Sequence, residues 1–510
     1  MGDLIGPLFG GIGLFLVPSV IVALVAGMLW GSFAGAMPGF NQTLAVGIVL
    51  PFTFALGPVE AISFLVAISV GVSFGNSIPA ILVGIPGTAS AVLTAIDGHA
   101  LHKQGRSGLA LGVAYFAATV GQFLSTIFFV LMVVPLSQLA YLFLAPELFA
   151  LTFMGMTAII SLTGKNVVKG LIAAGIGVGL TMVGPDPIGT VQRFSFGITD
   201  LRNGLQIVPL TLGLVAFSEI LRASRQAHDW QGLVVGFDAK FPRWSELRRT
   251  IPSVLGGTVI GTFIGAIPGM GGTPAAAVSY QQSKMLSKHP EEYGKGSVEG
   301  VAANEAAQNA AQAGEMVPTF GLGLPTTDSM VLLLAAMTIH GLVPGPLLIQ
   351  ETPEMLHAAV AGLLGATLLI VLLGWRISSL LLKVVTIDRR LVLVSAMALM
   401  IIGVYALRQS IFDLYVLLGT GLLGYFMSRY GYSTAAAAIA VVLGAYSEAY
   451  LRQGLNLMRN DWGQFLSRPI TAGILIFAGL ILIYGIYTNV REGRSAKQAL
   501  SAIGRPDPPA

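Results

Sequence analysis

Apolar runs long enough to cross a membrane recur along the sequence, and they constrain the fold more than any other feature. Each spans roughly twenty residues, enough to cross the ~30 Å hydrocarbon core of a bilayer as a helix. Four clear examples are "LFGGIGLFLVPSVIVALVAGMLW", "FLSTIFFVLMVVPLSQLAYLFL", "HAAVAGLLGATLLIVLLGW" and "PITAGILIFAGLILIYGIY". Only 10% of the residues are charged, which is too little polar surface to cover a soluble core of this size. The sequence predicts an all-α polytopic membrane protein with about a dozen transmembrane helices.

Charge and cysteine content narrow the remaining possibilities. The net charge of +4 does not favour nucleic-acid binding, and the absence of cysteine excludes disulfides and thiolate metal sites. The first apolar run has neither a basic flank nor a clear cleavage site, so we expect a retained helix. The basic tail, 491–510, favours a cytoplasmic C-terminus.

A polar, arginine-rich interruption divides the chain. Residues 221–250 carry Arg222, Arg225, Arg248 and Arg249 among other basic residues, which predicts a cytoplasmic linker. We therefore expect a first transmembrane repeat in 1–220, and a second repeat with following helices in 251–490.

Two motifs occur once in each half and in the same order. "GSFAGAMPGFNQT" (31–43) aligns without gaps on "GTFIGAIPGMGGT" (261–273), with seven of thirteen positions identical. "GNSIPAILVGIPGT" (75–88) shares both prolines, two glycines and the final threonine with "GEMVPTFGLGLPTT" (314–327). Duplicated halves with Gly/Pro breaks at matching places are the best sequence indication of a secondary-transporter binding site. We expect broken or re-entrant helices, and we favour inverted repeats in which one bundle moves against a scaffold.

The breaks themselves suggest an anion site. Proline removes a backbone donor and glycine permits a sharp turn, so inside a bilayer such a break must face protein or a wet cavity. The half-helix after Pro268 would direct free N–H groups into that cavity, where an anion is favoured. Close packing or a simple kink is the alternative. The residues expected to contact the anion are Asn41, Gln42, Thr43, Gly271, Gly272 and Thr273.

A polar stripe follows in the second half. On a helix, Glu305, Gln308, Asn309, Gln312 and Glu315 share one face, and alanines fill the others. This pattern favours a wet groove or bundle interior, whereas a surface helix outside the membrane is the alternative. The stripe residues expected to line the substrate cavity are Asn304, Glu305, Gln308 and Asn309.

Hydroxyl groups after the second pair of breaks suggest a site for a coupling ion. Thr326, Thr327 and Asp328 follow Pro325, and Thr88 follows Pro86. Hydroxyls, carbonyls and one carboxylate suit Na⁺ or a protonatable site, although helix N-capping accounts for the same residues equally well. We expect no other cofactor and no bound metal.

Other charged or chemical motifs add little. The stretch "DGHALHKQGRSG", which begins at Asp97, is typical of a solvated loop with a helix-stop signal and a structural role. Asp186 and Glu219 are expected to order a loop and a helix end. The sequence contains no HExxH, GxSxG or Walker lysine motif, so we expect neither an enzyme nor an ATP-driven pump.

Several long motifs resemble the large membrane subunit of tripartite tricarboxylate transporters, the TctA family. They include "GAIPGMGGT", "SYQQSKMLSKHPEEYGKGSVEGVAANEAAQNAA", "HGLVPGP", "GPDPIGTVQRFSFG" and "GYFMSRYGYSTAAAAIAVVLGAYSEAYLRQGL", and together they cover almost the whole chain. The resemblance implies a bacterial inner-membrane permease that imports citrate-like carboxylates with a cation, usually Na⁺. It also implies two partners, a small four-helix membrane subunit (TctB-like) and a periplasmic solute-binding protein (TctC-like).

The sequence departs from the family pattern at two places. The family commonly reads EAANNAA, but Gln308 stands at the first asparagine, and Thr326 stands where the family usually has glycine. A passive anion channel and a non-transporting membrane scaffold are the alternative functions. Neither explains why both halves keep Pro-Gly breaks followed by threonine.

Overall fold

The structure is a computed structural model in which the chain forms two compact units. It describes residues 2–37, 39–139, 143–163, 166–186, 191–225, 241–345, 348, 351–384 and 387–503. Pro38 of the first break, 226–240 of the expected linker and 504–510 of the expected basic tail lie outside these residues. Unit 1 comprises 1–142 and 205–425, and unit 2 comprises 143–204 and 426–510. This division does not follow the expected halves 1–220 and 251–490, which stay a prediction.

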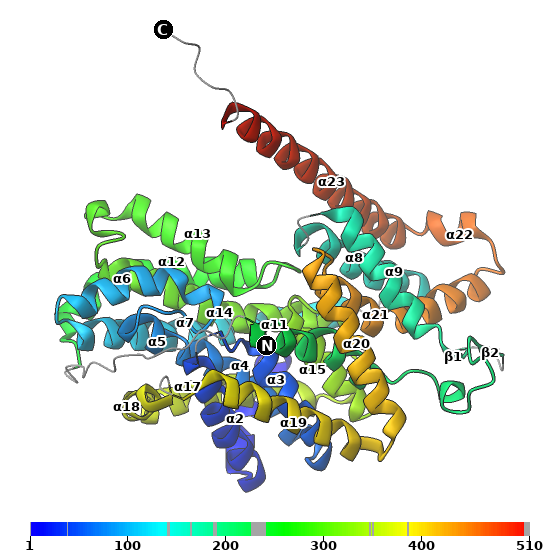
Figure 1. The fold of residues 1–510 in the computed structure, drawn as a ribbon, viewed down its shortest axis with the longest axis horizontal. Helices are drawn as coiled ribbons and strands as arrows, with labels where there is room; N and C mark the ends of the chain where they lie inside the picture. The colour runs from blue at the N-terminus through cyan, green and yellow to red at the C-terminus, as the bar shows by residue number, and fades with distance from the viewer. Residues whose placement is uncertain are drawn as a thin grey trace. The chain divides into compact units, whose positions relative to one another are not determined.

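Unit 1 carries both motif pairs and consists of helices (Figure 1). Its elements are α1 (Gly2–Gly13), η1 (Leu14–Leu16), α2 (Pro18–Ala36), α3 (Gln42–Val49), η2 (Leu50–Ala55), α4 (Pro58–Gly75), α5 (Ser77–Leu82), η3 (Ala89–Ala91), α6 (Val92–Lys103), α7 (Ser107–Leu139), α10 (Ile207–Thr211), η6 (Leu212–Phe217), α11 (Ser218–Arg225), α12 (Trp244–Gly265), α13 (Gly272–Leu286), η7 (Pro290–Glu292), α14 (Val298–Leu322), α15 (Asp328–Ile339), α17 (Glu354–Leu369), η8 (Ile370–Gly374), α18 (Trp375–Val384), α19 (Arg389–Arg408) and α20 (Ile411–Arg429, which ends in unit 2).

Unit 2 is smaller and contains the two short strands of the described chain. Its elements are α8 (Ala145–Thr163), α9 (Val167–Thr181), β1 (Gly184–Pro185), β2 (Gln192–Arg193), η5 (Asp200–Asn203), α21 (Thr434–Leu457), α22 (Trp462–Ser467) and α23 (Pro469–Ile503). The strands pair antiparallel. Asp186 lies beside Arg452, and Arg193 donates to Glu448 at 2.5 Å. These ion pairs connect the β1–β2 segment to α21, in agreement with the loop-ordering role expected for Asp186.

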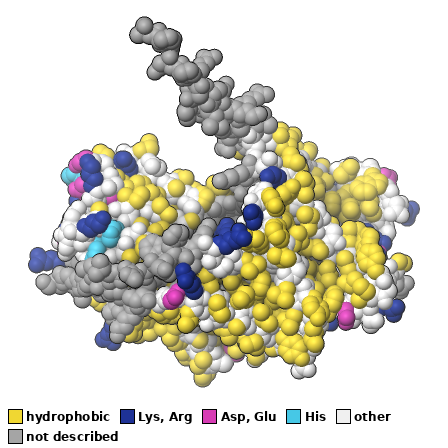
Figure 2. Space-filling view, viewed as in Figure 1, with side chains coloured by type: hydrophobic (Ala, Val, Ile, Leu, Met, Phe, Trp, Pro, Cys, Tyr) yellow, Lys and Arg dark blue, Asp and Glu magenta, His cyan; other side chains and the backbone are white. Residues whose placement is uncertain are grey.

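The helices have the length and the exposed surface of a multi-pass membrane protein. Nine helical stretches among the described residues are long and apolar enough to cross a bilayer. The stretch from Pro469 to Tyr487 exposes most of its apolar side chains, and Figure 2 shows broad apolar areas on the visible face. Such areas are far larger than a soluble surface tolerates. The membrane prediction is therefore supported, but nine candidate spans do not confirm the expected dozen helices.

Glycines bring the same two helix pairs into backbone contact in both halves. A Cβ on Gly31 of α2 would lie 2.3 Å from the carbonyl oxygen of Ile68 in α4. At the matching place, a Cβ on Gly261 of α12 would lie 2.2 Å from the carbonyl oxygen of Ala307 in α14. Real side chains cannot approach so closely, so both contacts require glycine. The second motif contributes in the same way, through Gly75 against Ser32 and Gly314 against Thr262.

The helices that follow each motif pair pack on the other half. The long helix α7, which follows the first pair, packs on α14, and α17, which follows the second pair, packs on α4. The shorter segments also contact the other half: α3 of the first half contacts α15, and α13 of the second half contacts η3. Elements of the two halves are therefore interleaved within unit 1.

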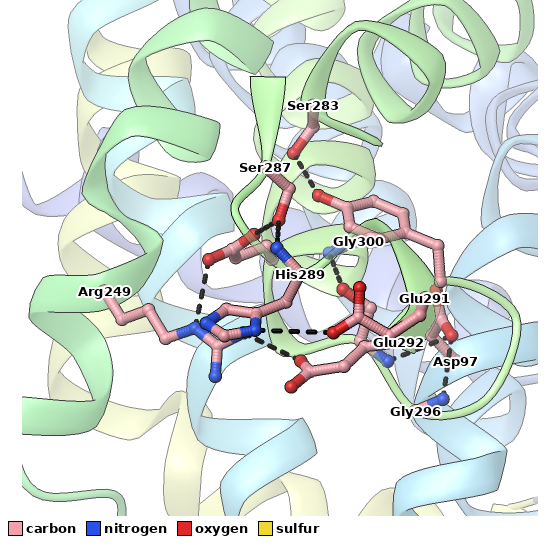
Figure 3. A network of polar contacts seen from close by, with 12 residues as sticks. Asp97, Arg249, Ser283, Ser287, His289, Glu291, Glu292, Gly296 and Gly300 are labelled. Carbon is pink, nitrogen blue, oxygen red and sulfur yellow. Dashed lines mark hydrogen bonds and ion pairs between the residues drawn. The ribbon is translucent and has the colours of Figure 1, made fainter. Parts of the chain in front are cut away.

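A buried aspartate fixes the loop between α13 and α14 (Figure 3). Asp97 of α6 is fully buried, and its Oδ1 accepts from the backbone N–H groups of Gly294, Gly296 and Ser297 at 2.8–3.0 Å. Its Oδ2 accepts from the hydroxyl of Tyr280 at 2.7 Å. The expectation of a solvated loop at Asp97 is wrong, because this residue lies inside α6 and the loop that it holds is nearly two hundred residues away in the sequence.

Next to Asp97, an exposed ion-pair cluster holds the outer part of the same loop. Arg249 of α12 donates to Glu292 at 2.7 Å and to Glu299 at 3.0 Å. Burial raises the pKa of Tyr293, whose hydroxyl lies 2.7 Å from that of Ser283. Tyr293 therefore stays protonated at neutral pH, and the loop keeps this contact.

Candidate functional site

Both halves contain the expected break within the first motif. Helix α2 ends at Ala36 and α3 begins at Gln42, while α12 ends at Gly265 and α13 begins at Gly272. Gly39 and Gly269 occupy matching places and have similar positive φ angles of 72° and 85°. An L-residue with a side chain rarely adopts this conformation, so glycine is needed at both turns.

An equivalent hydrogen bond joins the two breaks of each half. The N–H of Gly39 donates to the carbonyl oxygen of Gly87 at 3.1 Å, and that of Gly269 donates to the carbonyl oxygen of Thr326 at 2.8 Å. Gly87 and Thr326 are matching positions of the second motif. The backbone groups released by each break are thus partly satisfied by the other break of the same half.

Beside each joined pair of breaks lies a small polar cluster. In the first half, Asn76 donates to the hydroxyl of Thr88 at 2.7 Å, which lies 2.8 Å from that of Ser90. In the second half, Glu315 accepts from the hydroxyl of Thr327 at 3.1 Å, which lies 3.0 Å from Ser329. The clusters are built alike from matching positions, so the halves share a detailed geometry as well as a motif.

The clusters differ in one chemical respect. Asn76 is a neutral amide, whereas its counterpart Glu315 is a carboxyl group that is only 2% exposed. Glu315 Oε1 lies 3.2 Å from the Cβ position of Gly271, the residue before the start of α13. A protein carboxyl group therefore already lies at this helix start. The first half has no carboxyl group at the matching position.

Helix α14 is the central element of unit 1. All its residues from Val298 to Gly321 are buried, including every polar side chain of the stripe. The alternative of a surface helix is excluded by this burial. α14 packs on α7, α12 and α13, and its polar face meets the second break of the first half.

Asn304 and Glu305 converge on one hydroxyl group from the first half. The amide of Asn304 donates to Thr94 Oγ1 at 2.7 Å and to the carbonyl oxygen of Ser90 at 3.0 Å. The hydroxyl of Thr94 donates to Glu305 Oε1 at 2.6 Å. Asn309 donates to the backbone carbonyl of Glu305 at 2.9 Å. The side chains of Thr94, Asn304, Glu305 and Asn309 form a compact polar centre where α14 contacts α6.

Gln308 forms a closed amide pair with Asn76. Each amide donates to the other at 3.2 Å, and both side chains are buried. The pair connects the centre of α14 to the first-half cluster. Gln308 is one of the two residues at which this sequence departs from the pattern of the family that it resembles.

Replacing Gln308 with leucine should destabilise unit 1. The change removes both bonds and leaves the buried carbonyl of Asn76 without this donor, which costs about 1–3 kcal/mol. The measurement is the midpoint of thermal unfolding in detergent. Gln122→Leu is the matched control, because Gln122 is equally buried but the hydrogen bond of its side-chain amide to Thr126 is long, at 3.5 Å, and therefore weak. Equal midpoints for the two variants would contradict the assigned role of the amide pair.

The structure places the remaining expected residues in different environments. Asn41 caps α3 by accepting from the N–H of Leu44, and the buried Gln42 Nε2 has no partner among the described residues. Thr43 is 8% exposed, whereas its counterpart Thr273 is exposed. Asp328 has Glu219 and Arg222 of α11 as its electrostatic neighbours.

Sequence reasoning missed three residues of these clusters. Asn76, Ser90 and Thr94 all contact residues of α14 or the Thr88 hydroxyl. Alignment of the second motif could have indicated the first two, because Asn76 stands opposite Glu315 and Ser90 opposite Ser329. Thr94 has no such signal, since leucine stands at the matching position 333.

Comparison with known proteins assigns the chain to a family. The family model described as "Tripartite tricarboxylate transporter TctA family" matches residues 21–439. The chain belongs to the TctA family. It is a large subunit of a tripartite tricarboxylate transporter, and the family is one of transporters, in agreement with the absence of enzyme motifs.

Two relatives of the chain come from Agrobacterium vitis. One, named "Uncharacterized 52.8 kDa protein in TAR-I ttuC' 3'region", is 33% identical over 497 residues, covering 97% of this chain and 98% of the relative. Another, named "Uncharacterized protein in TAR-II ttuC' 3'region", is 33% identical over 234 residues, covering 46% of this chain and 97% of the relative. No solved structure matches the chain.

Proposed function

We propose that this TctA-family subunit is a cation-coupled secondary transporter that imports carboxylates such as citrate or other tricarboxylates. A periplasmic TctC-like binding protein delivers the substrate, and a small four-helix TctB-like subunit completes the complex in a bacterial inner membrane. The coupling ion is Na⁺ or H⁺. The family assignment supports a transporter component.

One observation carries the proposal, namely the equivalent bonds that join the breaks in both halves. In the first half the bond runs from Gly39 to Gly87, and in the second half it runs from Gly269 to Thr326. Each half therefore contains two broken helices that are joined at their breaks. Paired broken helices of duplicated halves are the common architecture of ion-coupled transporters. We infer that the halves are inverted repeats and that movement of one bundle against the other gives alternating access.

The substrate carboxylate is held at the start of α3 in the first half. Gln42 Nε2 is a buried donor without a partner among the described residues, and it lies in the first turn of α3. A carboxylate oxygen would accept from this amide and benefit from the free N–H groups and helix dipole. The neutral Asn76 in the first-half cluster adds no repulsion, unlike Glu315 in the second.

Uptake by reconstituted vesicles tests the proposal. The complete complex would be assembled with its binding protein, and radiolabelled mono-, di- and tricarboxylates would be offered with and without Na⁺ and with and without a pH gradient. We expect accumulation of at least one carboxylate that depends on one of the two gradients. Uptake that follows only the substrate gradient would indicate a passive channel, and no uptake at all would indicate a scaffold.

Gln42→Leu should weaken substrate recognition. Loss of one buried hydrogen bond to a charged group costs about 1.5–3 kcal/mol, which corresponds to a 10- to 100-fold rise in the KM of uptake. Gln464→Leu, on the exposed face of α22 in unit 2, is the control and should leave KM unchanged. An unchanged KM in Gln42→Leu would remove the start of α3 from the substrate site.

A further inference from the structure

Four buried oxygen atoms on neighbouring turns of α14 lack a hydrogen-bond partner among the described residues. They are Asn304 Oδ1, Glu305 Oε2, Asn309 Oδ1 and, about one turn farther along, Gln312 Oε1. The side chains of the first three are 0% exposed. Buried polar atoms are nearly always paired, and four unpaired acceptors so close together in the sequence indicate a missing positively charged or donor group.

The surrounding hydrogen bonds establish that the free amide atoms of Asn304 and Asn309 are oxygens. The nitrogen of Asn304 is held by two acceptors, Ser90 O and Thr94 Oγ1. The nitrogen of Asn309 is held by the backbone carbonyl of Glu305. Neither amide could be turned around without losing these bonds, so each presents its oxygen as the free atom.

A proton on Glu305 would not satisfy the group. Thr94 Oγ1 accepts from Asn304, so its own hydrogen is donated to Glu305 Oε1. Any proton would therefore sit on Oε2. A single proton supplies a single donor, so it could pair with only one of the two amide oxygens of Asn304 and Asn309, and the other would still lack a partner.

A carboxylate substrate does not satisfy the group either. Its oxygens are acceptors, and they would face the carboxyl group of Glu305 and two amide oxygens. The charge of Glu305 is also uncompensated, because none of the ion pairs among the described residues involves it. A buried unpaired charge is strongly unfavourable, so a cation is the partner that fits.

We propose that Asn304, Glu305 and Asn309 form a binding site for a monovalent cation, Na⁺, where α14 meets α6. All the available ligands are oxygens, as hard cations prefer. The one carboxylate of the site balances a single positive charge, which favours a monovalent ion. A site for a multivalent metal is not indicated, because no group of three His, Cys, Asp or Glu residues able to hold a metal ion occurs in the described part of the chain. This assignment rests on the proposed function. It makes Asn304, Glu305 and Asn309 ligands of the coupling ion, whereas the sequence predicted that they contact the substrate.

The site also connects the ion to both halves. Ser90 and Thr94 follow the second break of the first half, in η3 and α6, and they bond directly to Asn304 of the second half. A cation bound at Glu305 would hold this contact between α6 and α14 together. Its departure would weaken the same contact, which is how an ion can control movement of one half against the other.

Thermal unfolding of the purified protein in detergent tests the site without any need for transport. NaCl would be titrated against choline chloride at constant ionic strength, with no substrate present. We expect the unfolding midpoint of the wild type to rise with Na⁺, because a ligand that binds the folded state stabilises it. Glu305→Gln should abolish the rise, and Asn309→Leu should weaken the apparent Na⁺ affinity by about tenfold or more.

Glu315→Gln is the matched control, since Glu315 is a second buried carboxyl group on the same helix. It should keep the Na⁺-dependent rise. If Glu305→Gln does not fold, the Na⁺ dependence of the unfolding midpoint in Asn309→Leu and in the wild type still tests the site. No rise in the wild type, or loss of the rise in Glu315→Gln alone, would overturn the site. A normal Na⁺ response in a protein that transports no carboxylate would refute the proposed function and leave the site standing.

Discussion

Gly261→Ala is expected to lower the stability of unit 1 severely, although it adds a single carbon atom. The new Cβ would lie 2.2 Å from the carbonyl oxygen and 2.7 Å from the Cα of Ala307. Both are backbone atoms of α14, so α12 and α14 would have to separate. Overpacking of a core costs about 1–3 kcal/mol and more where the backbone must move. The measurement is the midpoint of thermal unfolding in detergent.

The duplicated architecture provides an internal check on this prediction. Gly31→Ala meets the carbonyl oxygen of Ile68 at 2.3 Å and should have a similar cost. Gly419→Ala is the control, because nothing lies within 4 Å of its Cβ position, and alanine is the better helix former by about 1 kcal/mol. If Gly261→Ala unfolded at the same temperature as Gly419→Ala, close packing of α12 on α14 would not hold the unit together.

The sequence predicted the helix breaks because their cause is local. The Pro-Gly pair at Pro268 and Gly269 requires a turn with a positive φ angle at the glycine, and Gly39 at the matching place adopts the same turn. Periodicity likewise predicted that the polar residues of α14 share one face. The family motifs added the class of protein.

The pairing of the polar residues could not be predicted, because it depends on contacts between distant segments. Asn76 bonds to Gln308 and Thr94 bonds to Glu305 across more than two hundred residues. Neither periodicity nor the repeat indicates which turn of α14 meets which turn of α6. The burial of Asp97 was missed for the same reason, since its partners lie in the loop before α14. Interleaving of the halves creates all these contacts.

Asp97→Ala is expected to release the loop between α13 and α14. Four donors lose a fully buried acceptor, namely the backbone N–H groups of Gly294, Gly296 and Ser297 and the hydroxyl of Tyr280. Hydrogen bonds to charged groups contribute about 1.5–3 kcal/mol each, and their losses are not additive. A total cost of about 3–5 kcal/mol is reasonable by analogy with broken buried ion pairs.

Ser297 makes this loss important for α14 itself, because its side chain caps the helix by accepting from the N–H of Gly300 at 3.0 Å. Freeing the loop therefore frays the start of the helix that carries the polar centre. Limited trypsin digestion should detect the change as faster cleavage after the exposed Lys288 and Lys295. Glu291→Ala alters the same loop but removes only an exposed contact to His289, which contributes little, so its cleavage should match that of the wild type. Equal cleavage rates in all three proteins would mean that the ion pairs of Arg249, and not Asp97, hold the loop.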